Sequence, residues 1–125
     1  MKLFLSFLIF LFPSFSYAEW TEISKSNSGD TFYLDYETIR KHNGFIYWWE
    51  MSDYMKPLKD GYMSGNAYKE GDCKIFRYRY LTINLYSNSM GTGTSENVTF
   101  EDDEWTYPKP DTVAESMLKI ICRLD

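Results

Sequence analysis

The chain has 125 residues, a formal net charge of −5 at pH 7, and aromatic side chains at 19% of its positions. A chain of this length forms one domain with a modest core. Its acidic balance argues against a nucleic-acid-binding protein and against binding to an anionic membrane surface, because both partners are negatively charged.

The first 18 residues have the pattern of an export signal. An apolar run, Leu3–Phe12, follows a basic residue, and Ser16 and Ala18 occupy the small-residue positions of a cleavage site. The run is too short to span a bilayer, which takes roughly 20 residues, so a retained membrane anchor is the weaker alternative. No cysteine follows the run, and we therefore expect no lipid anchor. We predict a signal peptide over 1–18, export to the periplasm or beyond, and a mature domain over 19–125 without a transmembrane segment.

The mature chain opens with segments that predict short strands. Trp20–Ser26 precedes a turn-rich stretch, and Thr31–Asp35 alternates between apolar and polar residues. Tyr36–Lys41 is polar and brief, which predicts a single helical or 3₁₀ turn. Asn43 and Gly44 then give a strong turn signal before the next strand.

The most hydrophobic strand is predicted over Phe45–Tyr54. It is apolar on both faces, a pattern that suits the centre of a sheet. One face can pack under a helix, whereas the other needs a cover: a loop, a second subunit or a ligand. Tyr62–Lys69 predicts a weaker strand, and Gly71 and Asp72 predict the turn that follows it.

Cys73–Ser87 predicts a long, bent strand. Simple alternation places Arg77 and Arg79 on the same face as Cys73. Burying both arginines without partners would be costly. We therefore expect either a bulge that changes the alternation or a carboxylate that pairs with one of them.

The next segment is polar and rich in small residues. Ser87–Ser95 predicts a flexible loop, Glu96–Phe100 predicts a strand, and Glu101–Glu104 is an acidic run. Clustered carboxylates can hold Ca²⁺, but the run lacks the spacing of a calcium-binding loop. We expect a solvated loop there and no metal site.

The C-terminal segment predicts the one long helix. Thr112 and Glu115 have the spacing of a capping box, with Asp111 as a rival N-cap. Apolar residues follow at helical intervals as far as Leu124, and charged residues occupy the opposite arc. The fold class is therefore α+β: an antiparallel sheet of about five to six strands, packed against one C-terminal α-helix.

The two cysteines, Cys73 and Cys122, predict a structural disulfide, because exported chains commonly carry them. Cys122 falls at the border of the apolar face of the helix, where it can reach sideways to a neighbouring strand. The alternative, a reactive thiol pair, usually shows closer spacing.

Aromatic side chains form the candidate partner surface. The same residues are also ordinary material for the core of a sheet, and the sequence leaves both readings open. As a surface they would contact another protein or a second copy of this chain. The set consists of Tyr47, Trp48, Trp49, Phe76, Tyr78 and Tyr80.

No catalytic constellation is present in the sequence. His42 is the only histidine, and it lies beside a turn with no nucleophile or orienting acid nominated nearby. Metal-ligand spacing, a glycine-rich phosphate loop and a nucleophile elbow are all missing. We expect a non-enzymatic protein without a cofactor.

With these segments placed, the mature chain resembles the bacterial surface-adhesin protein E family. The features that carry the resemblance are Trp20, the segment Leu34–Tyr54, Ser64 ahead of Asp72 and Cys73, the loop with Gly91 and Gly93, and WTYPKP before a helix ending in Cys122. The resemblance implies an antiparallel sheet with a C-terminal helix held by the disulfide. It also implies an adhesin-like envelope protein that binds extracellular or host proteins. Some members are outer-membrane lipoproteins, and this chain departs from them in lacking a lipidated cysteine. The alternative function is a periplasmic structural or assembly factor.

Overall fold

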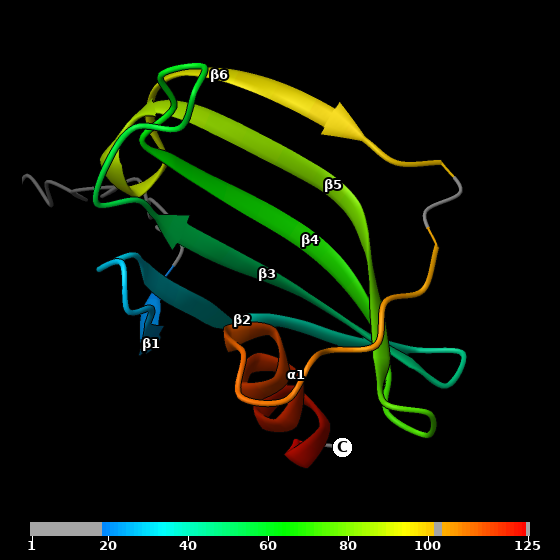
Figure 1. Ribbon diagram of the computed structural model, residues 1–125. Helices are drawn as coiled ribbons and strands as arrows, with labels where there is room; N and C mark the ends of the chain where they lie inside the picture. The colour runs from blue at the N-terminus through cyan, green and yellow to red at the C-terminus, as the bar shows by residue number, and fades with distance from the viewer. Residues whose placement is uncertain (1–18, 102–103, 125) are drawn as a thin grey trace, which may run out of the picture.

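The computed structural model describes residues 19–101 and 104–124, and the predicted signal peptide lies outside this range. Six antiparallel strands form one sheet in sequence order, and one α-helix packs against it (Figure 1). The predicted α+β class is confirmed. The elements are β1 (Thr21–Lys25), β2 (Thr31–His42), β3 (Phe45–Asp53), β4 (Ser64–Asp72), β5 (Arg77–Asn88), the 3₁₀ turn η1 (Ser89–Gly91), β6 (Thr92–Thr99) and α1 (Val113–Arg123).

The hairpin between β2 and β3 turns at the predicted position. Asn43 and Gly44 both adopt positive φ, 51° and 82°. A two-residue turn of this kind matches the twist of the flanking strands. Strand β3 therefore begins at Phe45, as the sequence predicts.

The predicted helical turn over 36–41 is wrong, because β2 continues through it to His42. The pairing with β3 shifts between Asp35 and Arg40, so the intervening residues form a bulge. The Asp35 carboxylate accepts a hydrogen bond from the backbone NH of Glu37 at 3.1 Å, and the Thr38 hydroxyl donates to the Asp35 carbonyl at 2.9 Å. Pairing with β3 on both sides of the bulge outweighs the local preference for a turn.

The turn between β4 and β5 spans 73–76 and so follows Gly71 and Asp72, the pair at which the sequence places it. Strand β4 runs through Gly71 to Asp72, and the turn ends at Phe76, whose NH donates to the Asp72 carbonyl at 2.8 Å. Gly71 marks a close approach instead of a turn, because a Cβ there would lie 2.7 Å from the Trp48 ring. Cys73 thus sits in the turn and is released from the alternation of β5.

Most of the predicted flexible loop over 87–95 is regular structure. Strand β6 already begins at Thr92, after the turn η1. The Ser64 hydroxyl holds this turn by donating to the Asn88 carbonyl at 2.6 Å and accepting from the Gly91 NH at 2.8 Å. These contacts come from β4, which sequence periodicity within the loop could not show.

Helix α1 begins where the capping residues predict. The Thr112 hydroxyl accepts a hydrogen bond from the Glu115 NH at 3.2 Å, and the Glu115 carboxylate accepts from the Asp111 NH at 3.3 Å. The helix lies across one face of the sheet (Figure 1), which we call the helix face; the opposite side is the open face. The core of the helix face consists of Leu34, Ile46, Trp48, Tyr78, Met117, Leu118 and Ile121.

The predicted disulfide is confirmed. Cys73 in the β4–β5 turn bonds to Cys122 in the last turn of α1, with their Cα atoms 5.6 Å apart. The bond ties the end of the helix to the sheet at the hairpin where β5 begins. It closes a loop of 49 residues, for which the chain-entropy model gives about 4 kcal/mol.

The double substitution Cys73→Ser and Cys122→Ser is expected to lower the free energy of unfolding by about 4 kcal/mol. Urea unfolding followed by circular dichroism measures the change. Reduced wild-type protein should behave like the variant, and an unchanged midpoint in both would contradict a structural role for the bond.

Candidate functional site

The candidate aromatic set divides between the two faces. Trp48 and Tyr78 are buried on the helix face, with 1% and 8% of their surface exposed, so they belong to the core and not to an accessible surface. Tyr80 lies half-buried on that face, and Phe76 packs against the core from the β4–β5 turn. Trp48 and Tyr78 are thus members of the core, while Phe76 and Tyr80 are partly buried residues that pack against it.

Tyr47 and Trp49 lie half-buried on the open face, because they alternate with Trp48 along β3. Tyr68 on β4 lies opposite Trp49 and contacts both rings. Its ring centroid is 5.0 Å from Trp49 in a stacked arrangement and 6.1 Å from Tyr47. These spacings fit attractive aromatic pairing. Sequence reasoning missed Tyr68, although its alternation within the predicted strand 62–69 was the available signal.

A second aromatic cluster lies on the open face where β3 and β5 begin. Trp105 stacks on Phe45 with centroids 5.6 Å apart, and the guanidinium carbons of Arg77 and Arg79 lie 4.4 Å and 4.5 Å from the Trp105 ring. Trp105 reaches this position because Thr106 pairs with Tyr78 as an isolated bridge. Nothing in the local sequence around Trp105 indicates that pairing.

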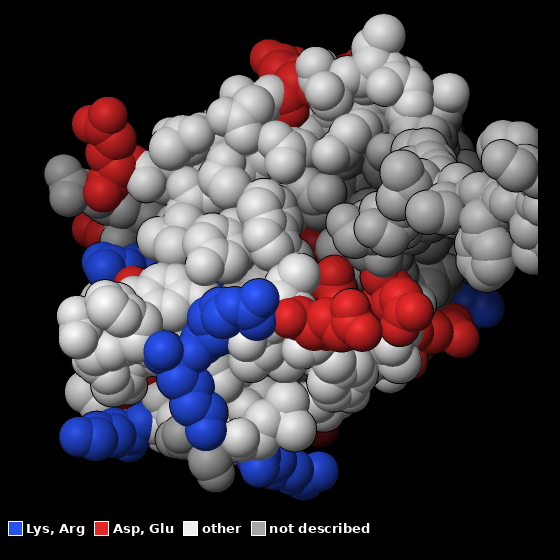
Figure 2. Space-filling view, turned by 180° about the vertical axis from the view of Figure 1, so that it is seen from behind, with Lys and Arg blue, Asp and Glu red and all other residues white. Residues whose placement is uncertain are grey.

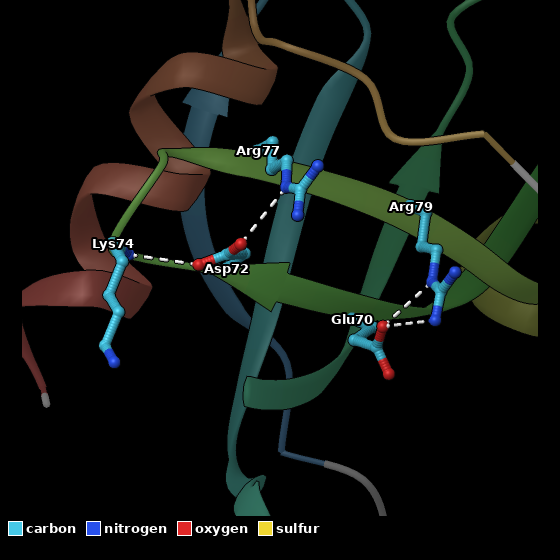
Figure 3. Close-up of polar contacts among 5 residues, drawn as sticks. All are labelled: Glu70, Asp72, Lys74, Arg77 and Arg79. Atoms are coloured by element: carbon cyan, nitrogen blue, oxygen red, sulfur yellow. Dashed lines mark hydrogen bonds and ion pairs between the residues drawn. The ribbon is translucent and has the colours of Figure 1, made fainter. Parts of the chain in front are cut away.

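Carboxylates of β4 hold both arginines. Arg77 Nε lies 3.1 Å from Asp72 Oδ2, while Arg79 Nε and Nη2 lie 2.8 Å and 2.7 Å from Glu70 Oε1 (Figure 3). A carboxylate paired with one arginine was one of the two alternatives that the sequence left open, and the structure has one for each arginine. Because the carboxylates fix the guanidinium planes against Trp105, the arginines are held in place before any partner arrives.

Tyr47 joins this network through its hydroxyl, which donates to Glu70 Oε2 at 2.5 Å. Burial and this hydrogen bond to a carboxylate raise the pKa of Tyr47 from 10.0 to about 12. The phenol therefore stays neutral throughout the physiological range. We call the whole surface the aromatic–arginine patch: Phe45, Tyr47, Trp49, Tyr68, Arg77, Arg79 and Trp105.

Figure 2 shows the molecule from the side of the open face. Uncharged side chains occupy much of this side, and charged side chains gather in a band and at its margins. On the described part of this side, the 3₁₀ turn η1 packs over Met51, and no further helix or sheet covers the strands. Rings, guanidinium groups and amide side chains thus remain available there. Such a composition is typical of protein-binding surfaces.

A hollow of about 220 Å³ lies on the helix face beside the start of α1, and two buried charges line it. Lys69 and Glu50, 5% and 7% exposed, form an ion pair. The Lys69 amine also lies 4.6 Å and 4.5 Å from the rings of Tyr78 and Tyr80.

This ion pair keeps Lys69 charged. Burial by itself lowers the pKa of Lys69, but the Glu50 carboxylate outweighs it, so the net pKa lies above its ordinary value. The Lys69–Glu50 pair therefore gives the hollow a charged, polar lining.

Neither His42 nor the described part of the acidic run 101–104 belongs to a recognisable catalytic or metal site. His42 is exposed in the β2–β3 hairpin beside the Asn43 side chain. The two middle residues of the acidic run 101–104 lie outside the described chain. Within the described residues, no three His, Cys, Asp or Glu side chains gather as a metal group. No helix of that same range is long and apolar enough to cross a bilayer.

Comparison with known proteins gives one family and one fold. A family model described as surface-adhesin protein E matches residues 20–123. Crystal form II of Haemophilus influenzae protein E is 18% identical, with a TM-score of 0.65, over 90% of this chain and 93% of that chain. Its selenomethionine form is 18% identical, with a TM-score of 0.66, over 89% and 91%. No curated protein matches the sequence.

Removing the buried carboxylate should strongly destabilise the protein. Glu50→Gln leaves the Lys69 charge buried without its counterion, for which we expect a loss of about 3–5 kcal/mol in the free energy of unfolding. The matched control is Lys119→Gln, which removes the exposed pair with Glu115 and should cost below about 0.5 kcal/mol. Urea unfolding compares the two, and equal small losses would contradict a buried pair.

The raised pKa of Tyr47 predicts a pH-dependent contribution to stability. Its folded value, about 12, exceeds the ordinary 10.0, so the contribution is complete below pH 10 and is lost as the pH rises through 12. The stability difference between wild type and Tyr47→Phe should therefore be constant up to pH 10 and shrink above it. Urea unfolding at each pH measures this difference. Tyr107→Phe, at an exposed position, should show no such trend, and a constant difference across the range would refute the assignment.

Proposed function

We propose, from the premise that this chain belongs to the surface-adhesin protein E family, that it is an exported, non-enzymatic adhesin that binds other proteins through the aromatic–arginine patch. The partner class is an extracellular or host protein. The mature domain in this proposal is 19–125, released from a signal peptide over 1–18. The observation that carries the proposal is a sheet face left uncovered by α1 and faced with rings and arginines.

The composition of the patch supports protein binding. Tryptophan, tyrosine and arginine are the residues that contribute most energy at protein interfaces. Trp105 is the central anchor, because Phe45, Arg77 and Arg79 all contact its ring. Rings held by their neighbours lose little conformational entropy when a partner docks.

The charges of the patch favour a selective partner. Arg77 and Arg79 are each paired with a carboxylate whose side chain is 8% or 7% exposed. Their charge is therefore largely balanced, while their N–H groups beyond the pairs can still donate to a partner. A partner that offers carbonyl or carboxylate oxygens around an apolar centre would satisfy both features.

A second candidate function is a periplasmic structural or assembly factor, including a homodimer. The feature that favours it is β6, an edge strand with all eight residues exposed. Strand edges with unpaired backbone groups can accept a strand from another chain. Light scattering of the purified domain and co-purification from native envelope separate this candidate from the first.

The test of the first candidate is binding of the mature protein to immobilised extracellular-matrix proteins, in glycosylated and enzymatically deglycosylated form, by surface plasmon resonance. We expect saturable binding to at least one deglycosylated protein. Trp105→Ala should weaken that binding by about 30-fold, as expected for an anchor worth about 2 kcal/mol.

Tyr107→Ala is the matched control, since Tyr107 lies two residues along the same segment, is 59% exposed and is outside the patch. Its affinity should equal that of wild type. Equal losses in both variants, or no saturable binding to any matrix protein, would reject the proposed surface.

A further inference from the structure

A groove of about 360 Å³ crosses the open face beside the aromatic–arginine patch and shares only Trp49 with it. Its lining comes from β2 to β5 and from the residue before β1: Trp20, Asp35, Thr38, Trp49, Asn66 and Asn84. Neighbouring strands lie about 4.8 Å apart, so the lining extends over roughly 19 Å across the sheet. The groove is therefore elongated, with the volume of a small-ligand site.

Carboxamides form one end of the groove, and their positions are fixed by each other. Asn84 Nδ2 donates to Asn66 Oδ1 at 2.9 Å, and Asn97 Nδ2 donates to Asn84 Oδ1 at 2.7 Å. Asn66 Nδ2 donates to the Tyr86 hydroxyl at 3.2 Å. A carboxamide has two N–H donors and two lone pairs on its oxygen. Asn66 and Asn84 thus each retain donor and acceptor capacity in a preset orientation.

The β2 bulge supplies the polar floor at the other end. Asp35 is 3% exposed, and the Glu37 NH orients its carboxylate by donating to Oδ1. Among the described residues, no lysine or arginine pairs with Asp35, and the groove lining contains no basic side chain. Such a carboxylate can accept hydrogen bonds from hydroxyl groups, and it disfavours an anionic ligand.

Two indoles, Trp20 and Trp49, provide the apolar surface of the groove. The Trp49 ring is held by its stack with Tyr68. The negative face of an aromatic ring attracts groups with partial positive charge. The axial C–H groups on one face of a hexopyranose have that character and form a flat surface of matching size.

We propose that this groove binds a neutral oligosaccharide. Its rings stack on the indoles, while its hydroxyl groups bond to Asp35, Asn66 and Asn84. A quaternary ammonium ion would also suit two indoles and a carboxylate. It offers no donor or acceptor to the two carboxamides, however, and it is too short for the groove. This inference goes beyond the proposed protein-binding function, and it does not depend on Trp105.

The test uses the mature protein on a printed array of neutral, sialylated and sulfated glycans, followed by calorimetric titration with the strongest neutral glycan. We expect neutral glycans to bind in preference to their sialylated forms, with Kd at or below about 1 mM. Trp20→Ala and Asn84→Ala should each weaken the titrated binding by at least about tenfold.

Trp105→Ala is the matched control on the same face, and it should bind the glycan like wild type while losing affinity for deglycosylated protein. Trp20→Ala should lose affinity for the glycan and bind deglycosylated protein like wild type. Either proposal can therefore be rejected while the other stands. Circular dichroism checks that each variant is folded. If Trp20→Ala does not fold, Asn84→Ala takes its place as the test of the groove. Binding of no neutral glycan, preference for anionic glycans, unchanged affinity in the folded variants, or displacement by tetramethylammonium chloride would each overturn the proposal.

Discussion

The described chain has six strands in one sheet and a single α-helix to cover them, and most of the molecule's properties depend on that imbalance. Met117, Leu118 and Ile121 bury one face of the sheet, and the disulfide to the β4–β5 turn keeps the end of the helix there. Among the described residues, only the turn η1 packs on the opposite face, and most of that face has no second layer of secondary structure. It must therefore be stable in water while carrying large aromatic rings.

The open face meets this requirement because its aromatic rings and its two paired arginines contact one another. Rings stack on rings, as in Trp49 on Tyr68, and arginines lie on Trp105 while their charges are met by carboxylates. Networks of this kind have few alternative arrangements, because each group fixes the next. The same order that stabilises the face also holds in place the side chains of the two binding surfaces that we propose, one for protein around Trp105 and one for sugar in the groove.

Much of the fold could be predicted because its signals are local. Asn43 and Gly44 specify their turn by their backbone preference, and Thr112 marks the start of α1. The sequence-based predictions that were wrong share one cause. Residues 36–41 and Ser89–Gly91 have turn-like composition, but backbone pairing with β3 and the Ser64 hydroxyl of β4 decide their structure. Gly71 looked like a turn residue, whereas it is a contact point for the Trp48 ring.

Residue types and their spacing were enough to infer the fold class, the helix with its cap and apolar face, the disulfide pair and the family resemblance. Each of these depends on residue type, on spacing along the chain, or on there being only two cysteines to pair. The division of the aromatic rings between core and solvent, in contrast, follows only from the three-dimensional packing. The same packing brings Trp105 to Arg77 and Arg79, and Asp35 to the same groove as Asn84. Those contacts join segments that are far apart in sequence. They depend on the register of the strands and on the bulge in β2, and no local sequence preference encodes either.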